Sequence, residues 1–241
     1  MKILGIDTST PIGSVALIDG ENIVAEHTLN IVQAHSSRLM PAIDTVLKWG
    51  EITPSDLDGC VVGIGPGSFT GIRIGVATAK SLCYAVDKPI VGVSTLEAIA
   101  YNLRWMDGFV CPILDARRSE IYGGVFHGGA EWQRFTDDLC LPIDVFLDEL
   151  DSHISSDSAI IFVGDGLATY GDAVAERLGQ TKIISGLQTA PTKEDAVIFA
   201  DAIFNVPRGA TIAKLGAQRL KQGDSDSYWT LVPNYVRIGL Y

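Results

Sequence analysis

The chain has 241 residues, with 18 Lys and Arg against 29 Asp and Glu, so its formal net charge at pH 7 is −11. This charge, with no basic cluster longer than Arg117-Arg118, argues against independent nucleic-acid binding, because phosphate contact needs dense positive charge. No apolar run approaches the roughly 20 residues that cross a bilayer. The four cysteines have no Cys-x-x-Cys spacing, so we expect a cytoplasmic protein with reduced thiols and no membrane contact.

The first half of the chain has the pattern of a mixed α/β unit. Continuous apolar runs predict strands, and apolar positions three or four residues apart predict helices. Asp19-Gly20 is a strong hairpin signal between the second and third strands. The elements predicted in this half are strands at 3–6, 13–18, 22–28, 60–64 and 89–93 and helices at about 35–49, 70–86 and 95–104.

The second half repeats this order of elements. It is predicted to contain strands at 110–114, 121–126, 130–135 and 160–163 and helices at 143–150 and 167–178. Three landmarks recur at similar offsets: an acid after the first strand (Asp7 and Asp115), a hairpin turn (19–20 and 128–129) and a glycine turn (Gly65 and Gly164). The chain is therefore predicted to use a βββαβα unit twice, and a repeat this long indicates two similar lobes rather than a solenoid.

A glycine-rich turn joins the strand at 60–64 to the helix at 70–86. Gly65 and Gly67, on either side of Pro66, permit backbone angles that a side chain would forbid. Ser68 or Thr70 is placed to cap the helix. Such a turn aims free amides at one point and is typical of an anion site, and it is equally typical of a tight structural turn without a ligand.

The helix after this turn carries a stripe of small residues. Its members lie at four-residue spacing and are Gly71, Gly75, Ala79 and Cys83. A glycine inside a helix costs roughly 1 kcal/mol relative to alanine, so two of them indicate a compensating close approach of another backbone. That backbone belongs either to this chain or to the helix of a partner.

A duplicated βββαβα unit with an acid after each first strand resembles the actin-like ATPase superfamily. The resemblance implies an α/β fold of two lobes, in which the acidic loops and glycine turns face each other across a cleft that holds phosphates and a hydrated magnesium ion. The residues that it places in such a nucleotide cleft are Asp7, Thr8, Ser9, Asp115, Arg117, Gly164, Asp165 and Gly166.

Several longer motifs narrow the resemblance. They are residues 3–10 (ILGIDTST), His35-Ser36 with Leu39-Met40-Pro41, 65–75 (GPGSFTGIRIG), 92–98 (GVSTLEA), 115–118 (DARR), 164–166 (GDG) and 233–237 (PNYVR). Together they span nearly the whole chain and resemble the TsaB family of bacterial threonylcarbamoyladenosine biosynthesis proteins, with Val236 where the family has leucine. The resemblance implies a non-catalytic subunit that pairs with the paralogous transferase TsaD and is joined by the ATPase TsaE. It also implies that tRNA is met only through the complex.

The superfamily also implies where the lobes begin and end. Its C-terminal helices pack back on the first lobe, so we expect helices at about 195–204 and 210–220 in that position. The predicted limits are a first lobe at 1–106, completed by helices within about 192–220, a second lobe at 107–191 and a C-terminal tail at 221–241. The polar stretch 222–227 is predicted to be a mobile loop.

The residues predict neither a metal site nor a catalytic one. The catalytic paralogue uses a His-x-x-x-His pair, and the histidines of this chain (27, 35, 127 and 153) lack that spacing. Ser68 has no evident base. Active superfamily members have glycines after the second acid, where this chain has Ala116, Arg117 and Arg118, so the nucleotide cleft is predicted to be degenerate.

Two interpretations of the acids stay open at this point. In the first, Asp7 and Asp115 hold a magnesium ion through water, and an arginine holds a phosphate. The chain would then bind ATP or ADP weakly with Mg²⁺, at the lobe or subunit junction. No cofactor is predicted to be required. Alternatively, both acids are inherited loop residues that hydrogen-bond locally.

Three functional hypotheses follow. The first is a scaffold that docks the catalytic paralogue through the helices at 35–49 and 70–86, with an interface made of His35, Leu39, Ile43, Gly71, Arg73, Gly75, Ala79 and Cys83. The second is a stand-alone ATP-dependent small-molecule kinase, favoured by the two acidic loops and disfavoured by Arg117-Arg118. The third is a self-associating regulator, because the same helices could form a homodimer when the chain is alone.

Overall fold

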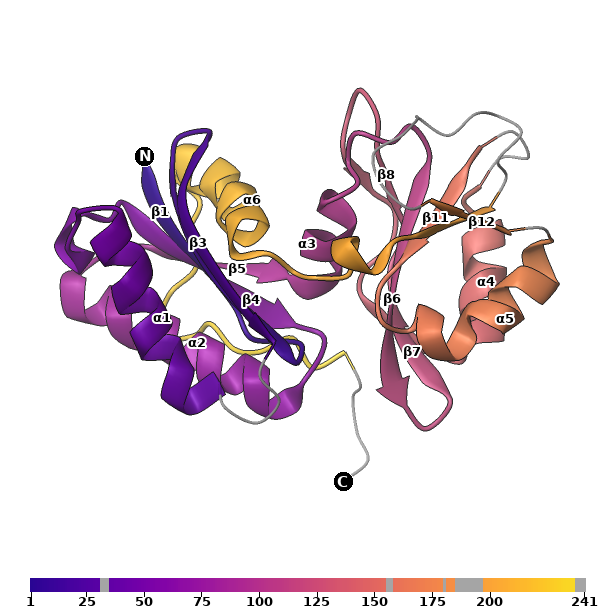
Figure 1. Ribbon diagram of the computed structural model, residues 1–241, viewed down its shortest axis with the longest axis horizontal. Helices are drawn as coiled ribbons and strands as arrows, with labels where there is room; N and C mark the ends of the chain where they lie inside the picture. Colours follow the sequence, from indigo (N-terminus) through magenta and orange to yellow (C-terminus); the bar gives the residue numbers. More distant parts are fainter. Residues whose placement is uncertain (31–34, 155–157, 180, 185–196, 237–241) are drawn as a thin grey trace. The chain divides into compact units, whose positions relative to one another are not determined.

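The computed structural model describes residues 1–30, 35–154, 158–179, 181–184 and 197–236 (Figure 1). Contacts divide the chain into two compact units. Unit 1 contains Met1–Ala98 and Pro207–Tyr235, and unit 2 contains Ile99–Val206. This division differs from the predicted limits, because residues 99–106 belong to unit 2 and residues 221–235 belong to unit 1.

Unit 1 is built on a five-stranded sheet with the strand order β3-β2-β1-β4-β5. Its strands are β1 (Lys2–Asp7), β2 (Ile12–Asp19), β3 (Asn22–Asn30), β4 (Gly59–Gly65) and β5 (Ile90–Ser94). The first three strands are antiparallel neighbours, whereas β4 lies parallel to both β1 and β5. Strands covered on both faces are apolar throughout, which is why the runs at 3–6 and 60–64 predicted them correctly.

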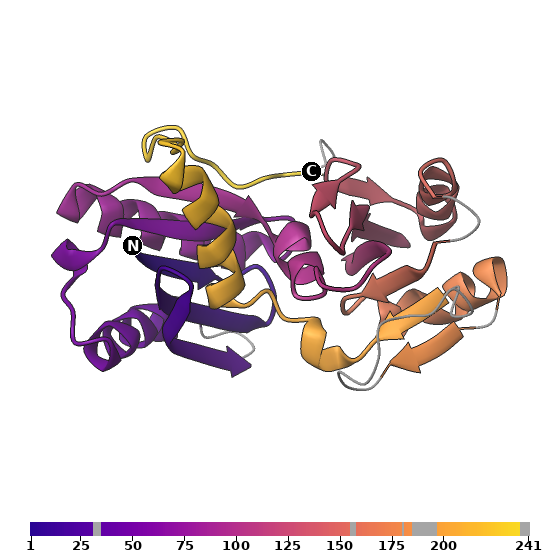
Figure 2. The ribbon, with the colours of Figure 1, turned by 90° about the horizontal axis from the view of Figure 1, so that it is seen from above.

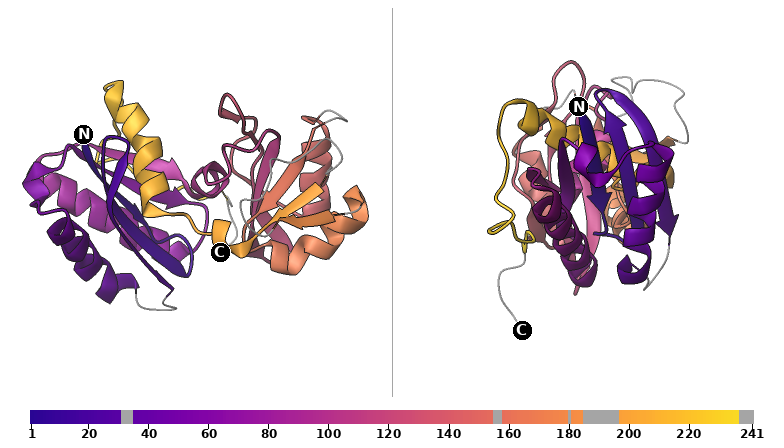
Figure 3. Two further views of the ribbon diagram at one scale, coloured as in Figure 1. Left: turned by 45° about the horizontal axis from the view of Figure 1, so that its top comes forward. Right: turned by 90° about the vertical axis from the view of Figure 1, so that its left-hand side faces the viewer.

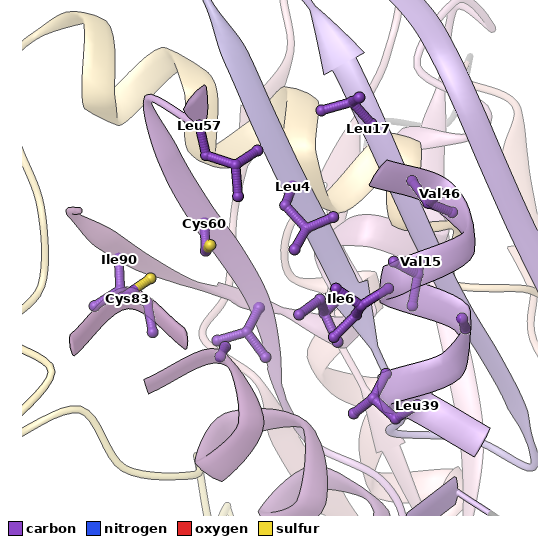
Figure 4. Close-up of a cluster of buried hydrophobic side chains, with 14 of the residues drawn as sticks. Leu4, Ile6, Val15, Leu17, Leu39, Val46, Leu57, Cys60, Cys83 and Ile90 are labelled. Atoms are coloured by element: carbon purple, nitrogen blue, oxygen red, sulfur yellow. The ribbon is translucent and has the colours of Figure 1, made fainter. Parts of the chain in front are cut away.

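Helices cover both faces of this sheet. On one face lie α1 (His35–Trp49) and α2 (Phe69–Val86), and on the other lies α6 (Gly209–Lys221) (Figures 1 and 3). The core between the sheet and α1 and α2 contains Leu4, Ile6 and Val46, all fully buried (Figure 4). The predictions of α1, α2 and α6 are confirmed, and the acid Asp7 stands at the carboxyl end of the central strand.

Unit 2 contains a second mixed sheet, in the order β10-β7-β6-β11-β13-β12 over the described residues. Its strands are β6 (Phe109–Arg117), β7 (Glu120–Gly123), β10 (Leu139–Leu141), β11 (Ile160–Val163), β12 (Thr181–Ile184) and β13 (Val197–Ala200), with the short β8 (Phe126–His127) and β9 (Gln133–Arg134) beside β6. The helices α4 (Ile143–Asp151) and α5 (Leu167–Leu178) pack against this sheet. The two sheets confirm the predicted duplicated α/β fold of the actin-like class.

The third strand of the second repeat was predicted at the wrong place. The run at 130–135 forms only the short β9, and the strand that pairs with β7, as β3 pairs with β2, is β10. The run at 121–126 is also divided, into β7 and β8. A Cβ at Gly123 would lie 2.8 Å from the Phe146 ring, so α4 packs closely on the end of β7. The glycine turn at 128–129 joins β8 to β9 and is not the counterpart of the turn at 19–20.

The helix predicted at 195–204 was wrong over residues 197–200. Residues 197–200 form β13, which inserts between β11 and β12 and is parallel to both. An unbroken apolar run suits a strand that has neighbours on both sides. Asp201 then caps a short 3₁₀ helix (Ala202–Phe204) by accepting a hydrogen bond from Ile203 N at 3.1 Å. Positions 195 and 196 lie outside the described residues.

Residues 222–235, named here the C-terminal segment, are held on unit 1 (Figure 2). Arg219 of α6 pairs with Asp224 at 2.6 Å and with Asp226 at 3.1 Å. Asp226 also accepts a hydrogen bond from Gly92 N of β5 at 2.7 Å. The prediction of a mobile loop at 222–227 was therefore wrong. The sequence did not reveal these ion pairs, because acids five and seven residues after an arginine form no periodic pattern.

Candidate functional site

The acid of unit 1 is buried rather than open to solvent. The Asp7 side chain has no exposed surface, and its Oδ1 accepts hydrogen bonds from Ser9 N at 2.9 Å and from Ser9 Oγ at 2.7 Å. Its Oδ2 is buried with no hydrogen-bond partner among the described residues. Burial raises the pKa of this carboxyl to about 7, against the two Ser9 hydrogen bonds that lower it.

Gly63 of β4 explains why Asp7 is so enclosed. A Cβ at position 63 would overlap Asp7 Oδ2, so the carboxyl lies directly on the main chain of the neighbouring strand. A magnesium ion keeps several waters of hydration and needs carboxylate oxygens that water can reach. The geometry of Asp7 does not fit a hydrated magnesium ion, and it favours the interpretation that the acid is a loop residue with local hydrogen bonds.

The next two residues of this loop contact the glycine turn and α2. Thr8 Oγ1 donates a hydrogen bond to Gly71 O at 2.7 Å, and Ser9 O accepts one from Ser68 N at 2.6 Å. Ser68 also caps α2, because its Oγ accepts a hydrogen bond from Gly71 N at 3.2 Å. Part of the amide set that an anion site would use is thus already engaged within the chain.

The glycines of this region each give room to the same loop. A Cβ would overlap Ser9 O at Gly67, Thr8 O at Gly71 and Thr8 Oγ1 at Gly75. The turn Gly65-Pro66-Gly67 has positive φ at both glycines, 106° and 152°, so a side chain there would also be strained. Three glycines of the GPGSFTGIRIG motif, at 67, 71 and 75, are therefore explained by close packing against residues 8 and 9, whereas Gly65 lies against Ile72 and Asn234.

The small-residue stripe of α2 faces the interior of unit 1. Gly71, Gly75, Ala79 and Cys83 are all buried. Of the two alternatives for the approaching backbone, the structure supports this chain's own loop. The expectation that these four residues form the partner interface was wrong, because a partner cannot contact side chains that the sheet already covers.

The other predicted interface residues differ in their exposure to solvent. Leu39 and Ile43 of α1 are only 5% and 2% exposed and belong to the core. Arg73 is exposed on the outward side of α2, with its guanidinium 3.6 Å from the centre of the Phe69 ring. Arg73 Nε also donates a hydrogen bond to Tyr235 of the C-terminal segment at 2.8 Å. The side chain of His35 lies outside the described residues.

The acid of unit 2 is neutralised locally. Asp115 Oδ1 accepts a hydrogen bond from Arg117 N at 2.7 Å, and Oδ2 pairs with the Arg117 guanidinium at 3.1 Å. The hairpin that follows has left-handed backbone angles at three consecutive residues, with φ of 63° at Arg117, 58° at Arg118 and 63° at Ser119. This strained tip places side chains where active superfamily members have glycines, as the sequence predicted.

The glycine turn of unit 2 is closed in a similar way. Gly164 N donates to Asn205 Oδ1 at 2.8 Å, and Gly166 N donates to Ile113 O at 3.1 Å. Asp165 Oδ1 accepts a hydrogen bond from Asp115 N at 3.2 Å. Because these amides already have partners, this turn does not fit the cradle that a phosphate requires. Neither the Asp7 loop nor the loops of unit 2 therefore support the kinase hypothesis.

Two residues of these loops were missed by sequence reasoning. Gly63 interrupts an otherwise apolar strand, and that interruption was a usable signal of close approach. Asn205 lies 41 residues after the amide that it occupies, and nothing in the sequence pairs the two. Across the described ranges, no group of three His, Cys, Asp or Glu side chains comes together in a way that could hold a metal ion.

The two sheets, the duplicated order of elements and the degenerate acid loops define a member of the actin-like ATPase fold class. The family model for TsaD, tRNA N6-adenosine threonylcarbamoyltransferase, matches residues 22–237. The TsaB protein of Bacillus subtilis is 33% identical over 240 residues, which cover 99% of this chain and 95% of that protein. The chain belongs to the TsaB family of tRNA threonylcarbamoyladenosine biosynthesis proteins.

Further comparisons agree with this assignment. The Escherichia coli TsaB protein is 35% identical over 138 residues, covering 53% of this chain and 59% of that protein. A Pseudomonas aeruginosa structure described as similar to peptidase YEAZ superposes with a TM-score of 0.77 at 24% identity, over 98% of this chain and 99% of that one, and so shares the fold. None of the described helices has both the length and the apolar character needed to span a membrane.

Proposed function

We propose that this chain serves tRNA threonylcarbamoyladenosine biosynthesis as a non-catalytic subunit, paired in the cytoplasm with a TsaD-like transferase and joined there by a TsaE-like ATPase. Membership of the TsaB family supports the assignment to this pathway. The buried carboxyl of Asp7, with Gly63 against it, is the observation that carries the non-catalytic role. With a net charge of −11, the chain would meet tRNA only through its partner.

The partner surface proposed here differs from the buried stripe. It is the outward side of α2 with the C-terminal segment that lies beside it. Its exposed members, named here the outer surface, are Phe69, Arg73, Tyr84, Trp229, Val232 and Tyr235. Aromatic residues and arginine dominate binding energy at protein interfaces, and this surface contains four aromatic rings and one arginine within unit 1.

Contacts within the outer surface hold it in one arrangement. Tyr84 lies edge-on to Trp229, with ring centres 5.4 Å apart, and Lys80 Nζ donates a hydrogen bond to Leu231 O at 2.8 Å. A preorganised surface loses little conformational entropy when a partner binds. When the partner is absent, the same surface would join two copies of this chain, so homodimer and heterodimer would compete.

Binding of purified TsaD-like paralogue tests this surface. We expect the variant Tyr84→Ser with Trp229→Ser to weaken the heterodimer by more than about tenfold, as measured by isothermal titration calorimetry. Ile203→Ser is the control, because Ile203 is a large apolar residue of unit 2 that is 71% exposed, as Trp229 is 72% exposed. If the paralogue binds the double variant as tightly as the control, the outer surface is not the interface.

A further inference from the structure

We infer that the Thr8-Ser9 loop is a clamp that sets the position of α2, and that through α2 it sets the outer surface against which the partner docks. Only the last step, in which a partner docks on the outer surface, rests on the proposed function. In this account the loop that in the superfamily approaches a nucleotide has become a positioning element, and Thr8 is its central residue.

The contacts of the clamp lie at regular intervals along α2. Ser9 O holds the turn through Ser68 N, Thr8 O lies against Gly71, and Thr8 Oγ1 lies against Gly75 while it bonds Gly71 O at 2.7 Å. Glycines one turn apart thus face two different atoms of one threonine. A helix seated on both atoms can neither slide along its axis nor rotate without losing one contact.

Asp7, at the end of β1, holds the Thr8-Ser9 loop on the sheet. Its Oδ1 accepts both the Ser9 amide and the Ser9 hydroxyl, which fixes the carbonyl groups of residues 8 and 9 with respect to the sheet. Hydrogen bonds between Asp7 and Ser9 and between Ser9 and Ser68 therefore connect β1 to the start of α2, so that β1 fixes the position of α2.

The outward side of α2 is displaced by any change at the clamp. Arg73 lies between the two clamped glycines in sequence and on the exposed side of the helix. Its guanidinium is fixed between Phe69 and Tyr235, so a shifted helix would separate Arg73 from the C-terminal segment. The clamp therefore positions outer-surface residues that it does not touch.

A double-mutant cycle at Thr8 and Gly75 tests the clamp. The added Cβ of Gly75→Ala would overlap Thr8 Oγ1, whereas the next atoms, Thr8 Cβ and Val62 Cγ2, are 3.6 and 3.7 Å away. Removing the hydroxyl with Thr8→Ala therefore makes room for the new methyl group. We expect Gly75→Ala to weaken paralogue binding by about tenfold and the double variant to return to the level of Thr8→Ala alone.

Gly71→Ala is the matched control for this rescue. Its Cβ would overlap the main-chain oxygen of Thr8, which no substitution at position 8 removes. We therefore expect Thr8→Ala to leave the binding defect of Gly71→Ala unchanged. All affinities are compared at a temperature at which circular dichroism shows each variant to be folded, so that a loss of folded protein is not counted as a loss of binding.

Hydrogen exchange of the α2 amides supplies a readout that needs no partner. Alanine favours helices more than glycine does, so without the clamp Gly75→Ala would slow exchange in α2. The clamp predicts faster exchange in Gly75→Ala than in the wild type, and in the double variant exchange no faster than in Thr8→Ala alone. Slower exchange in Gly75→Ala, or folded Gly75→Ala that binds the paralogue with wild-type affinity, overturns the inference. If the wild-type chain fails to bind the paralogue while exchange follows the predicted cycle, the proposed function fails and the clamp on α2 stands.

Discussion

The carboxyl of Asp7 lies against Gly63 of the adjacent strand, so closely that a Cβ at position 63 would overlap Oδ2. This contact joins the two most informative features of unit 1, the acid after β1 and the glycine within β4. It is part of the burial that removes the carboxyl from water and so raises the pKa of Asp7 to about 7.

The contribution of Asp7 to the stability of the protein should therefore fall as pH rises. Asp7 has a raised pKa in the folded state, about 7 against 3.8, so between these values the folded chain keeps a proton that the unfolded chain has released. Asp7 then lowers the free energy of unfolding progressively from pH 4 to pH 7 and by a constant amount above that, at most roughly 4 kcal/mol.

Asp7→Asn removes this pH dependence. We expect the variant to be more stable than the wild type at pH 8, where the wild type buries a charge, and to lose that advantage at pH 4.5. Urea denaturation across this range measures the difference, and Asp172→Asn, at an exposed carboxyl of α5, is the control that should leave the profile unchanged. Parallel profiles for the wild type and Asp7→Asn would contradict the assignment.

Gly63→Ala should be strongly destabilising. The added methyl group has no space beside Asp7, and overpacking of a core typically costs 1–3 kcal/mol. Gly171→Ala in α5 is the matched comparison, because its Cβ would meet only the Phe199 ring at 3.4 Å. We expect that change to stabilise the protein by up to about 1 kcal/mol through helix propensity. Thermal unfolding of both variants distinguishes the two environments.

The C-terminal segment should loosen when Asp226 is replaced. Asp226→Ala removes the hydrogen bond from Gly92 N and the ion pair with Arg219, so we expect a loss of about 1–2 kcal/mol and faster proteolysis near Trp229. Asp224→Ala removes only a more exposed ion pair with the same arginine and should cost less stability than Asp226→Ala. Equal sensitivity of the two variants to limited proteolysis would refute this ranking.

Asn205 should act as a structural residue rather than a ligand residue. Asn205→Ala leaves Gly164 N without its partner, so we expect a loss of about 1–2 kcal/mol in the stability of unit 2 and no gain of ATP binding. Chemical denaturation gives the first quantity and fluorescence titration with a labelled ATP analogue gives the second. Tight nucleotide binding by the variant would show that the turn retains a phosphate cradle.

Much of unit 1 could be predicted from the sequence because its patterns are local. The apolar runs of β1 and β4 and the three-to-four spacing of α1 and α2 each depend on one element and its own buried face. Unit 2 was harder, because β10 and β13 are each defined by the strands with which they pair, β7 for the first and β11 and β12 for the second. The run at 197–200 has the same composition whether it ends as a strand or as a helix, and only its neighbours β11 and β12 decide.

The candidate site shows the same division. The four-residue spacing of Gly71 and Gly75 predicted a close approach correctly, since two glycines in a helix need a reason. It could not say whose backbone approaches, because Thr8 is far away in sequence and the contact exists only after β1 and β4 have paired. Arg73 was predicted to be an interface residue and stays a prediction, whereas Trp229 and Val232 of the outer surface had no signal beyond being apolar.

We propose that the chain is needed for the modification of tRNA and that its Asp7 loop binds no nucleotide. The most direct test is the amount of threonylcarbamoyladenosine formed on unmodified tRNA by the TsaD-like paralogue and the TsaE-like ATPase, with the wild-type chain, with Asp7→Asn, or with neither. We predict that omission abolishes product and that Asp7→Asn supports at least about half of the wild-type rate, because a neutral side chain still accepts the Ser9 hydrogen bonds. Product formation by folded Asp7→Asn as low as that without the chain would contradict it, as would full activity when the chain is left out.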